Sequence, residues 1–222
     1  MSAPPEFQLS KTPSGFPYIE LKTTSLTPIF LTTFYKHDTK TLPALLSLSS
    51  LAHQLIAIPQ PYTLSDAQWW INLQMSGKSN LPLQVLRSGD PETGTMVGAV
   101  SLMPGDSEAL ASVSSQLVAL GETMLQDNEC ELGYYLHPDY QGKRIMGSAV
   151  KALLWWGKEE CGATNVVIKI LEENVKSRAV VEKMGVGKVW RRCEAEDSWV
   201  NWPEVKGGGR KKLLVWRWTG EL

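Results

Sequence analysis

The sequence predicts one domain of the α/β or α+β class, in which strands alternate with helices around a single core. Three observations lead to this class. The chain has 222 residues, of which 43% are hydrophobic, so a core can form without a disulfide or a metal. Helical patterns of apolar residues alternate with short runs that are typical of strands. The sequence contains no internal repeat.

The N-terminal region is expected to contribute a tail and the first elements of the domain. Residues 1–28 are rich in Pro, Ser and Thr, which predicts a mobile tail with room for a short strand at Tyr18–Lys22. We expect the domain to occupy residues 29–222. It begins with a strand at Ile29–Phe34, a helix at Leu42–Ile58 and a second helix with Ser65 as its N-cap.

The middle of the chain predicts a hairpin and a helical insertion. Leu81–Arg87 and Thr95–Leu102 flank a turn that contains Gly and Pro, as the strands of a hairpin do. Between Ser107 and Gln126 the apolar residues recur at spacings of three and four, which predicts an amphipathic helix within an insertion at about 104–128. Its apolar stripe could close as a lid or form a dimer seam, but packing onto the core is the usual role.

The second half of the chain alternates strands and helices. The predicted helices are Ile145–Cys161 and Asn174–Met184, which end at Gly162 and Gly185. The predicted strands are Cys130–Leu136, Asn165–Leu171, Val189–Arg192 and Leu213–Trp218. The second of these strands is almost continuously apolar, so we expect it to be covered on both faces.

Charge is unevenly distributed, although the formal net charge is only −1. Residues 88–142 include nine acidic side chains and neither Lys nor Arg, whereas residues 143–222 include sixteen basic and ten acidic side chains. These regions could hold a cationic and a polyanionic partner, or they could be ordinary solvated faces. The small net charge and the pI of about 6.3 argue against a nucleic-acid partner bound through bulk charge.

The chain shows no sign of export or membrane insertion. Cys130, Cys161 and Cys193 are odd in number and lack Cys-x-x-Cys spacing, which predicts reduced thiols and no metal site. The N-terminus has neither the basic start nor the apolar core of a signal peptide. The longest uncharged stretch, Leu42–Tyr62, contains three prolines and is too polar to span a membrane. We therefore expect a soluble cytoplasmic protein.

Residues 131–149 carry the strongest functional signal. They predict a strand, then a turn that contains Pro and Gly, and then the start of a helix. Unpaired amides and the positive end of the helix dipole attract phosphate at such a helix start. Lys143 and Arg144 add two positive charges there. Alone, this arrangement is a weak signal, because most turns of this kind are structural.

At this point the sequence resembles the GNAT superfamily of acyl-CoA-dependent N-acetyltransferases, and most closely its ribosomal-protein N-terminal acetyltransferase (RimJ/RimL-type) branch. Three blocks carry the resemblance in the family's order. Gln141–Met146 resembles the pyrophosphate loop, Glu173–Val186 resembles the helix with the pattern Asn-x-x-Ser…Glu-Lys-x-Gly, and Pro61–Trp70 resembles the N-terminal region of that branch. The resemblance spans about residues 29–218.

The resemblance implies an α+β, GNAT-like fold: a mixed, splayed, largely antiparallel central sheet with helices on both faces. It places the pantetheine arm of acetyl-CoA between the strand that ends at Leu136 and the strand Val166–Leu171. The cofactor-binding residues that it implies are Leu136, Gln141, Gly142, Lys143, Arg144, Ile145, Met146, Gly147 and Asn174.

The sequence departs from the family pattern at three positions. Arg144 replaces the usual glycine of the loop, and Met146 replaces its Gly or Ala. The Arg144 side chain fits if its backbone is helical and it points outward, where it could reach a phosphate; otherwise it crowds the cofactor. Val181 stands where many members have the tyrosine that protonates the departing thiolate.

Catalysis by direct attack of a neutral amine on the thioester requires a base, because an aliphatic amine is protonated at neutral pH. We expect Glu131 to be this base, although it could be an exposed carboxylate at a strand start. His137 could also serve, but its position before Pro138 favours a role in the turn. Ser177 matches the proposed acid of the RimJ/RimL-type branch, or is a small residue that lets the helix approach the cofactor. Asn174 could bind the cofactor, cap its helix, or do both.

These expectations give a function and an alternative. The first is transfer of an acetyl group from acetyl-CoA to a primary amine, either a protein N-terminus or a small cationic amine, in a ternary complex. The alternative is a catalytically weak relative that binds CoA or acts as a scaffold, which Arg144 and Val181 motivate. The expected protein is a monomer or a homodimer without a membrane or nucleic-acid partner.

Overall fold

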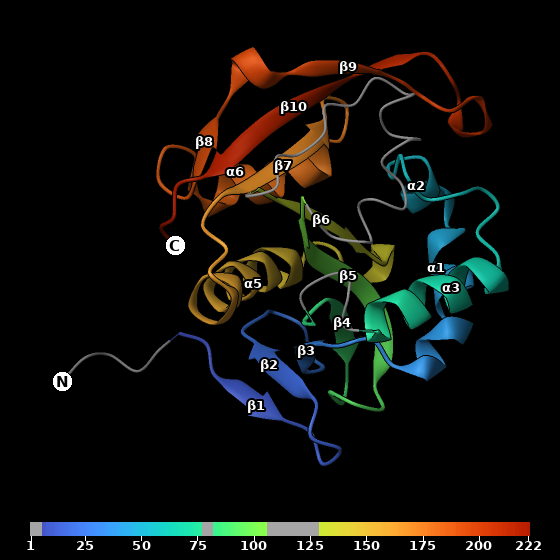
Figure 1. Cartoon of the computed structure of the whole chain (residues 1–222), viewed down its shortest axis with the longest axis vertical. Helices are drawn as coiled ribbons and strands as arrows, with labels where there is room; N and C mark the ends of the chain where they lie inside the picture. Colours follow the sequence, from blue (N-terminus) through green and yellow to red (C-terminus); the bar gives the residue numbers. More distant parts are fainter. Residues whose placement is uncertain (1–5, 77–81, 106–128) are drawn as a thin grey trace.

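The computed structural model describes residues 6–76, 82–105 and 129–222. Its strands form one sheet in the order β1-β2-β3-β4-β5-β6-β7-β10-β8, with β9 paired to β10 (Figure 1). The neighbouring strands are antiparallel except for β6 and β7, which are parallel. The strands are β1 Leu9–Lys11, β2 Pro17–Leu21, β3 Ile29–Thr32, β4 Val85–Ser88, β5 Thr95–Pro104, β6 Cys130–Leu136, β7 Val166–Leu171, β8 Trp190–Arg192, β9 Ser198–Asn201 and β10 Arg210–Trp218.

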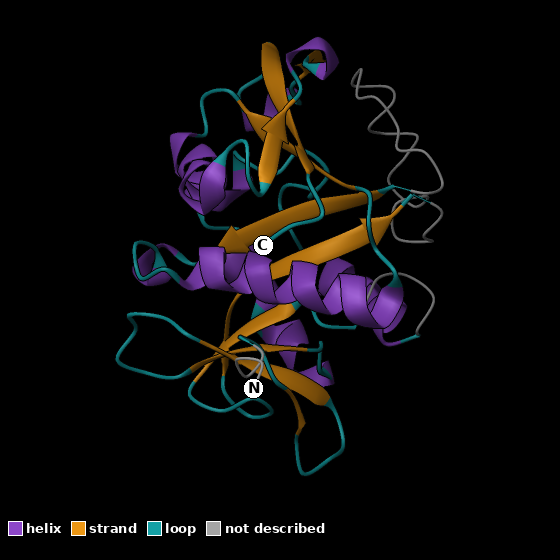
Figure 2. Cartoon of the chain, turned by 90° about the vertical axis from the view of Figure 1, so that its left-hand side faces the viewer, coloured by secondary structure: helices purple, strands orange, loops and turns teal. Residues whose placement is uncertain are grey.

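Helices cover both faces of this sheet. The helices are α1 Leu42–Leu46, α2 Ser49–Ala52, α3 Leu64–Met75, α5 Ile145–Cys161 and α6 Val175–Gly185. The long helix α5 lies across one face, as Figure 2 shows, and its apolar residues share a core cluster with Leu132, Ile168 and Trp216 of the sheet. Helices α1 and α3 pack in a second cluster with Val85 and Ala99. The predicted mixed, largely antiparallel sheet between two helical layers is confirmed.

The sheet is splayed between β6 and β7. The two strands pair only at Cys130↔Val166 and Glu131↔Val167, which lie at their N-terminal ends. β6 remains paired with β5 over its whole length, and β7 with β10 over Val167–Leu171. The facing edges of β6 and β7 therefore separate toward their C-terminal ends.

The N-terminal residues depart from the predicted mobile tail, although the short strand expected at Tyr18–Lys22 is present as β2. Residues 9–11 and 17–21 form β1 and β2, which extend the sheet beyond β3. Phe7, Ile19 and Leu21 are buried, and the Phe7 ring lies 5.9 Å from the Trp155 ring of α5. The high content of Pro, Ser and Thr concealed this packing, because only a few apolar side chains hold the segment to the core.

Two predicted helices differ in detail. The helix expected at Leu42–Ile58 is broken into α1 and α2, and turns follow α2, since this stretch has few of the charged residues that favour a long surface helix. The second helix has Thr63 as its N-cap instead of Ser65: the Thr63 hydroxyl accepts a bond from the Asp66 amide, and the Asp66 carboxylate accepts one from the Thr63 amide. The helix expected within 104–128 lies outside the described residues.

The remaining elements follow the predicted pattern, with one addition. The predicted hairpin is present as β4 and β5, and helices α5 and α6 end close to Gly162 and Gly185 as expected. Strand β9 was not predicted, and it pairs with β10 from Arg210 to Leu213. Its four residues are too few to give a clear alternation along the sequence.

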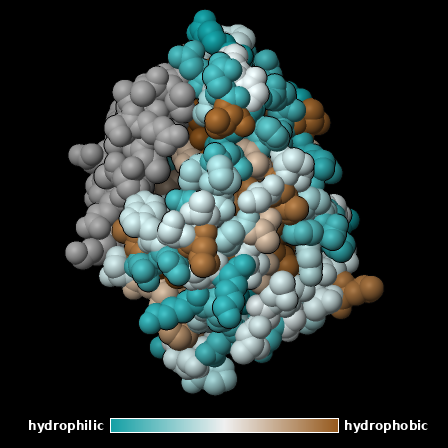
Figure 3. Space-filling model, turned by 90° about the vertical axis from the view of Figure 1, so that its right-hand side faces the viewer, coloured by the Kyte–Doolittle hydropathy of each residue, from teal (hydrophilic) through white to brown (hydrophobic). Residues whose placement is uncertain are grey.

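On the side of α1–α3, the described residues form no extended apolar face. There, apolar residues lie in small groups among hydrophilic ones (Figure 3). Within the parts of the chain that the structure describes, no helix combines the length and the apolar character needed to cross a bilayer. All three cysteines are free thiols, as predicted.

Candidate active site

The opening between β6 and β7 leads to the turn that precedes α5. Residues 138–140 form a short 3-10 helix, and α5 begins at Ile145. The amides of Ile145, Met146 and Gly147 belong to the first turn of α5, where an α-helix provides no acceptor for them. The predicted strand, turn and helix start are thus present, and their unpaired amides lie at the wide end of the splayed strands.

Arg144 has an unusual backbone conformation at this helix start. It is the N-cap of α5 with φ 58° and ψ 12°, and no other non-glycine residue in the described ranges has a positive φ. The Arg144 backbone is therefore left-handed and does not have the helical conformation that we expected to accommodate its side chain. The left-handed conformation costs an L-residue about 1–2 kcal/mol. Glycine is free of this cost. The Arg144 side chain is exposed, as expected for one that points outward.

Three contacts hold the turn in place. The Thr24 amide donates to the Lys143 carbonyl oxygen at 3.1 Å. The Gln141 side-chain amide donates to the Leu136 carbonyl oxygen at 3.0 Å, while its oxygen accepts a bond from the Lys176 ammonium at 2.8 Å. Gln141 thus links the end of β6 to the start of α6. The Leu136 carbonyl retains a second lone pair for a ligand.

Glu131 lies at the closed end of the opening, on the face opposite α5 and α6. Its carboxylate is 3.4 Å from the Lys169 ammonium of β7, and the two side chains are 19% and 10% exposed. Glu131 pairs with Val167, so Lys169 stands two residues further along β7 on the same face. Because Glu131 is largely buried and paired with Lys169, it is not the exposed carboxylate at a strand start that the sequence left as an alternative.

Helix α6 places Asn174 and Ser177 on the other side of the opening. The Asn174 side-chain oxygen accepts a bond from the Ser177 amide at 3.0 Å, which confirms its capping role. The Ser177 hydroxyl donates to the Tyr134 hydroxyl at 2.9 Å. Burial raises the pKa of Tyr134 and the hydrogen bond from Ser177 lowers it; burial is the larger effect, and together they give a pKa of about 12. Val181 is buried on the same helix, with 1% of its surface exposed.

His137 takes the structural role that we favoured. Its Nδ1 atom accepts a bond from the Asp139 amide at 3.2 Å and so caps the short 3-10 helix of the turn. Its ring also lies edge-on to the Tyr140 ring, at 6.2 Å between centroids.

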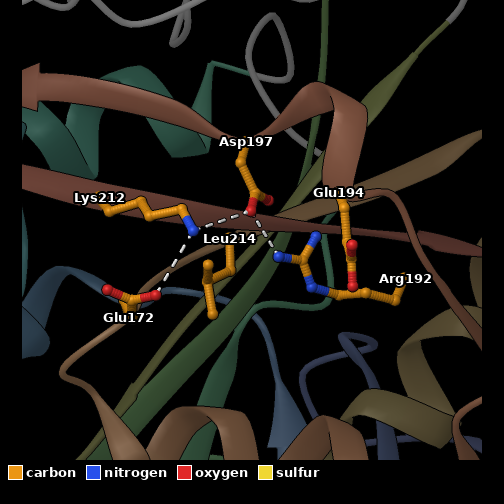
Figure 4. Close-up of a pocket in the computed structure, with 6 residues that line it drawn as sticks. All are labelled: Glu172, Arg192, Glu194, Asp197, Lys212 and Leu214. Atoms are coloured by element: carbon orange, nitrogen blue, oxygen red, sulfur yellow. Dashed lines mark hydrogen bonds and ion pairs between the residues drawn. The ribbon is translucent and has the colours of Figure 1, made fainter.

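The acidic residues near position 195 hold their own turn to β10. Asp197 pairs with Arg192 at 2.6 Å, and Glu196 pairs with Arg217 at 2.9 Å. Burial raises the pKa of Asp197, but bonds from Arg192 and the Val215 amide outweigh this and keep it below its usual value. Figure 4 shows the pocket of about 460 Å³ beside this turn, which is lined by Glu172, Arg192, Glu194, Asp197, Lys212 and Leu214.

Ion pairs join the lining residues of the pocket in Figure 4 to one another. Lys212 lies 3.5 Å from Asp197 and 3.5 Å from Glu172, so its charge is balanced from two sides. Across the described ranges, no group of three or more His, Cys, Asp or Glu side chains is placed to hold a metal ion.

Sequence reasoning missed two residues that shape the site. Lys206 is 4% exposed and its ammonium donates to the carbonyl oxygens of Leu55, Ile56 and Ile58. This contact holds the loop after α2, in which Ile56 packs against the apolar cluster that includes Leu171 of β7 and Leu213 of β10. No local pattern marks a lysine whose partners are 148–151 residues away. Tyr134 is the second, and strand alternation places it on the helix-facing side.

Comparison with known proteins gives one family and many related structures. Residues 29–186 match the family described as an acetyltransferase (GNAT) domain. No curated protein matches the sequence. The fold resembles that of ribosomal-protein-S5-alanine acetyltransferase from Vibrio fischeri, with 15% identity and a TM-score of 0.57 over 87% of this chain and 95% of that one.

Two further structures were solved with ligands. RimJ from Mycobacterium smegmatis, in complex with CoA-disulfide, has 13% identity and a TM-score of 0.61 over 89% of this chain and 84% of that one. The microcin C7 self-immunity acetyltransferase MccE, in complex with acetyl-CoA and AMP, has 17% identity and a TM-score of 0.57 over 85% and 91% of the two chains. At these identities the likeness concerns the fold.

Proposed function

The chain belongs to the GNAT acetyltransferase family, and we propose that this acyl-CoA-dependent N-acetyltransferase moves the acetyl group of acetyl-CoA to a primary amine. One observation supports this most directly: β6 and β7 pair at two positions only, and the open strand edges lead to the helix start of α5. An extended chain with amide groups can lie along such edges, and a diphosphate suits the amides and positive charges at the helix start.

The proposed cofactor site uses the residues at the wide end of the opening. The amides of Ile145, Met146 and Gly147 face the diphosphate, with Gln141 and Gly142 shaping the turn before them. Lys143 and Arg144 add charge, Leu136 offers backbone groups to the pantetheine arm, and Asn174 keeps its amide nitrogen for the cofactor while its oxygen caps α6. In this proposal the left-handed backbone of Arg144 directs the loop amides as glycine does in relatives.

The proposed reaction is a direct transfer. The amine loses a proton to Glu131, attacks the thioester carbonyl carbon, and displaces the coenzyme as a thiol. Backbone amides near Leu136 stabilise the oxyanion that develops. We place Ser177, on the opposite side of the opening from Glu131, at the site where the departing sulfur receives its proton. The two proton transfers are thus placed on opposite faces of the sheet, one at Glu131 and the other beside Ser177.

The proposed acceptor is a protein N-terminus or a small cationic amine. Ribosomal-protein acetyltransferases among the structural relatives act on protein N-termini, and the acidic residues 88–139 would attract a cationic acceptor. We further propose that the protein acts in the cytoplasm, as a monomer or homodimer.

Calorimetry with acetyl-CoA, followed by measurement of thiol release with peptide N-termini and small amines, tests this function. We expect binding in a one-to-one ratio and thiol release with at least one class of amine. Charge reversal by Lys143→Glu should weaken acetyl-CoA binding by about tenfold or more, because the diphosphate then meets a carboxylate. The matched control is Lys183→Glu, an exposed residue at the far end of α6. Binding without turnover on any amine would favour the weak or scaffolding relative.

A further inference from the structure

Tyr134 spans the opening from β6 to α6. Its side chain leaves β6 on the helix-facing side, and its hydroxyl meets the first turn of α6 at Ser177. The ring is half-buried against the core cluster that α5 and the sheet share. A phenol therefore stands beside the separated strand edges. Its hydrogen bonds are to Ser177, not to the turn before α5 or to the closed end of the opening.

Tyr134 lies along β6 between the phosphate-binding turn and Glu131, on the path that we propose for the cosubstrate. β6 begins at the closed end, where Glu131 pairs with Val167, and ends at Leu136 near the phosphate-binding turn. Tyr134 lies three residues after Glu131, or about 10 Å along the strand, and on the opposite face. A chain that enters from the turn therefore passes Leu136, then Tyr134, and meets Glu131 last, on the other face.

The hydrogen bonds at Tyr134 suit a proton donor. The Ser177 hydroxyl donates to the phenol oxygen at 2.9 Å, and the phenol donates its own proton to the Ser177 carbonyl oxygen at 3.1 Å. If the phenol proton turns toward a sulfur anion, the Ser177 hydroxyl still donates to the phenol oxygen. The charge that forms on that oxygen is then stabilised without any movement of the backbone.

We propose that Tyr134 protonates the departing sulfur and that Ser177 is a positioning residue which stabilises the resulting phenolate; this rests on the proposed function. The amine nitrogen forms the C–N bond after Glu131 takes its proton. The C–S bond then breaks and its electron pair goes to sulfur, which receives the Tyr134 proton. The phenolate then regains a proton from water. Glu131 and the nitrogen of the new amide each release one proton to water, so transfer to a protonated amine releases one proton overall.

Tyr134 fits this role better than its neighbours. A phenol is a stronger acid than the aliphatic alcohol of Ser177, and the Ser177 proton already points to Tyr134. Val181 stands one turn after Ser177 on α6, is buried and has no proton to give. The hydroxyl that relatives carry on this helix is, in our proposal, supplied here from the neighbouring strand.

The test compares three variants by kcat and by acetyl-CoA affinity. Tyr134→Phe should lower kcat by about a hundredfold or more, with acetyl-CoA affinity changed by less than about threefold. Ser177→Ala should lower kcat by about tenfold, because the donor remains but its anion is less stable. Tyr18→Phe, in β2 and far from the opening, is the matched control and should change neither value.

Replacement of Tyr134 by a difluorotyrosine gives a readout that a structural role does not affect. Fluorination keeps the shape of the ring and makes the phenol a stronger acid, so the activity lost in Tyr134→Phe should return. The basic limb of the kcat–pH profile should move to lower pH. An unchanged kcat in Tyr134→Phe, or an unshifted limb in the fluorinated protein, would overturn the role of Tyr134. Absence of acetyl-CoA binding or turnover in the wild-type protein would overturn the proposed function itself.

Discussion

The Thr24 amide donates a hydrogen bond to the Lys143 carbonyl oxygen, so the segment after β2 fixes a peptide group of the turn before α5. The carbonyl and the next amide of a trans peptide point in opposite directions. With the Lys143 carbonyl held toward Thr24, the Arg144 amide points away from it. The N-terminal strands and the proposed phosphate site are therefore connected by one bond.

Removal of this bond should weaken cofactor binding. Thr24→Pro deletes the amide hydrogen, and we expect acetyl-CoA affinity to fall by about five- to tenfold, which corresponds to one hydrogen bond. Thr24→Ala keeps the amide and should bind as the parent does. Calorimetry on both variants checks this, and equal affinities in the two would show that the bond does not orient the turn.

Arg144→Gly should change stability and binding in opposite directions. Glycine adopts the left-handed conformation without the cost to an L-residue, so we expect the free energy of unfolding to rise by up to about 1 kcal/mol. The loss of a positive charge should weaken acetyl-CoA binding. Denaturant titration and calorimetry measure the two effects separately. A less stable Arg144→Gly protein would mean that contacts of the arginine side chain outweigh the backbone cost.

Glu131→Gln tests the proposed base. We expect kcat to fall by about a hundredfold or more, because the amide cannot accept the amine proton, while acetyl-CoA affinity stays nearly constant. The loss should be largest at low pH, where most of the amine is protonated. Glu173→Gln alters an exposed carboxylate that pairs with Lys211, and serves as the control. Equal rates of the mutant and parent proteins across pH would remove Glu131 from this role.

Gly98 in β5 permits the close approach of β6. A Cβ atom on Gly98 would lie 2.4 Å from the Tyr135 carbonyl oxygen and 3.0 Å from the Leu136 Cα atom. Gly98→Ala should therefore force β5 and β6 apart and lower the free energy of unfolding by about 1–3 kcal/mol. Gly133→Ala is the control, since its Cβ would meet only the Ser101 hydroxyl at 3.9 Å. Thermal denaturation of both variants distinguishes this clash from a general effect of glycine replacement.

Lys206 should make stability depend on pH in the alkaline range. Burial lowers the pKa of Lys206 to about 8. Between pH 8 and the ordinary pKa of lysine, the unfolded chain binds a proton that the folded chain has released, so the free energy of unfolding rises with pH. Below pH 8 both states carry the proton and this contribution is constant.

Lys206→Met should abolish this dependence and destabilise the protein by about 2 kcal/mol or more at pH 7, because three carbonyl oxygens lose their donor. Urea titrations at pH 7 and pH 9.5 give the difference between the parent and the variant. That difference should grow with pH, and it should stay constant for the exposed control Lys183→Met.

The sequence was most informative where local chemistry determines structure. The α5 and α6 helices, β6 and β7 could be predicted because their periodicity and their capping residues lie within each segment, as with Asn174 and Gly162. The family resemblance then predicted the separation of β6 from β7. Phe7 and Ile19 show the limit, because their segment is ordered by packing on distant residues that no local window includes.

The finer contacts of the site depend on geometry that the sequence does not encode locally. The Glu131–Lys169 ion pair requires the register of two parallel strands 38 residues apart, and the bond between Tyr134 and Ser177 spans 43 residues. The left-handed backbone of Arg144 is concealed because arginine rarely adopts it. These features depend on how the strands and helices are arranged relative to one another in the folded protein.

The separated edges of β6 and β7 also have a consequence for the lifetime of the protein. Beyond Glu131 and Val167 the two strands do not pair with each other, and a ligand that occupies the opening stabilises only the folded state, by an amount that grows with its concentration. Cells starved of acetyl donors would then hold a larger unfolded fraction of this chain for proteases to remove. The abundance of the enzyme would follow the supply of its own cosubstrate, without any dedicated regulator.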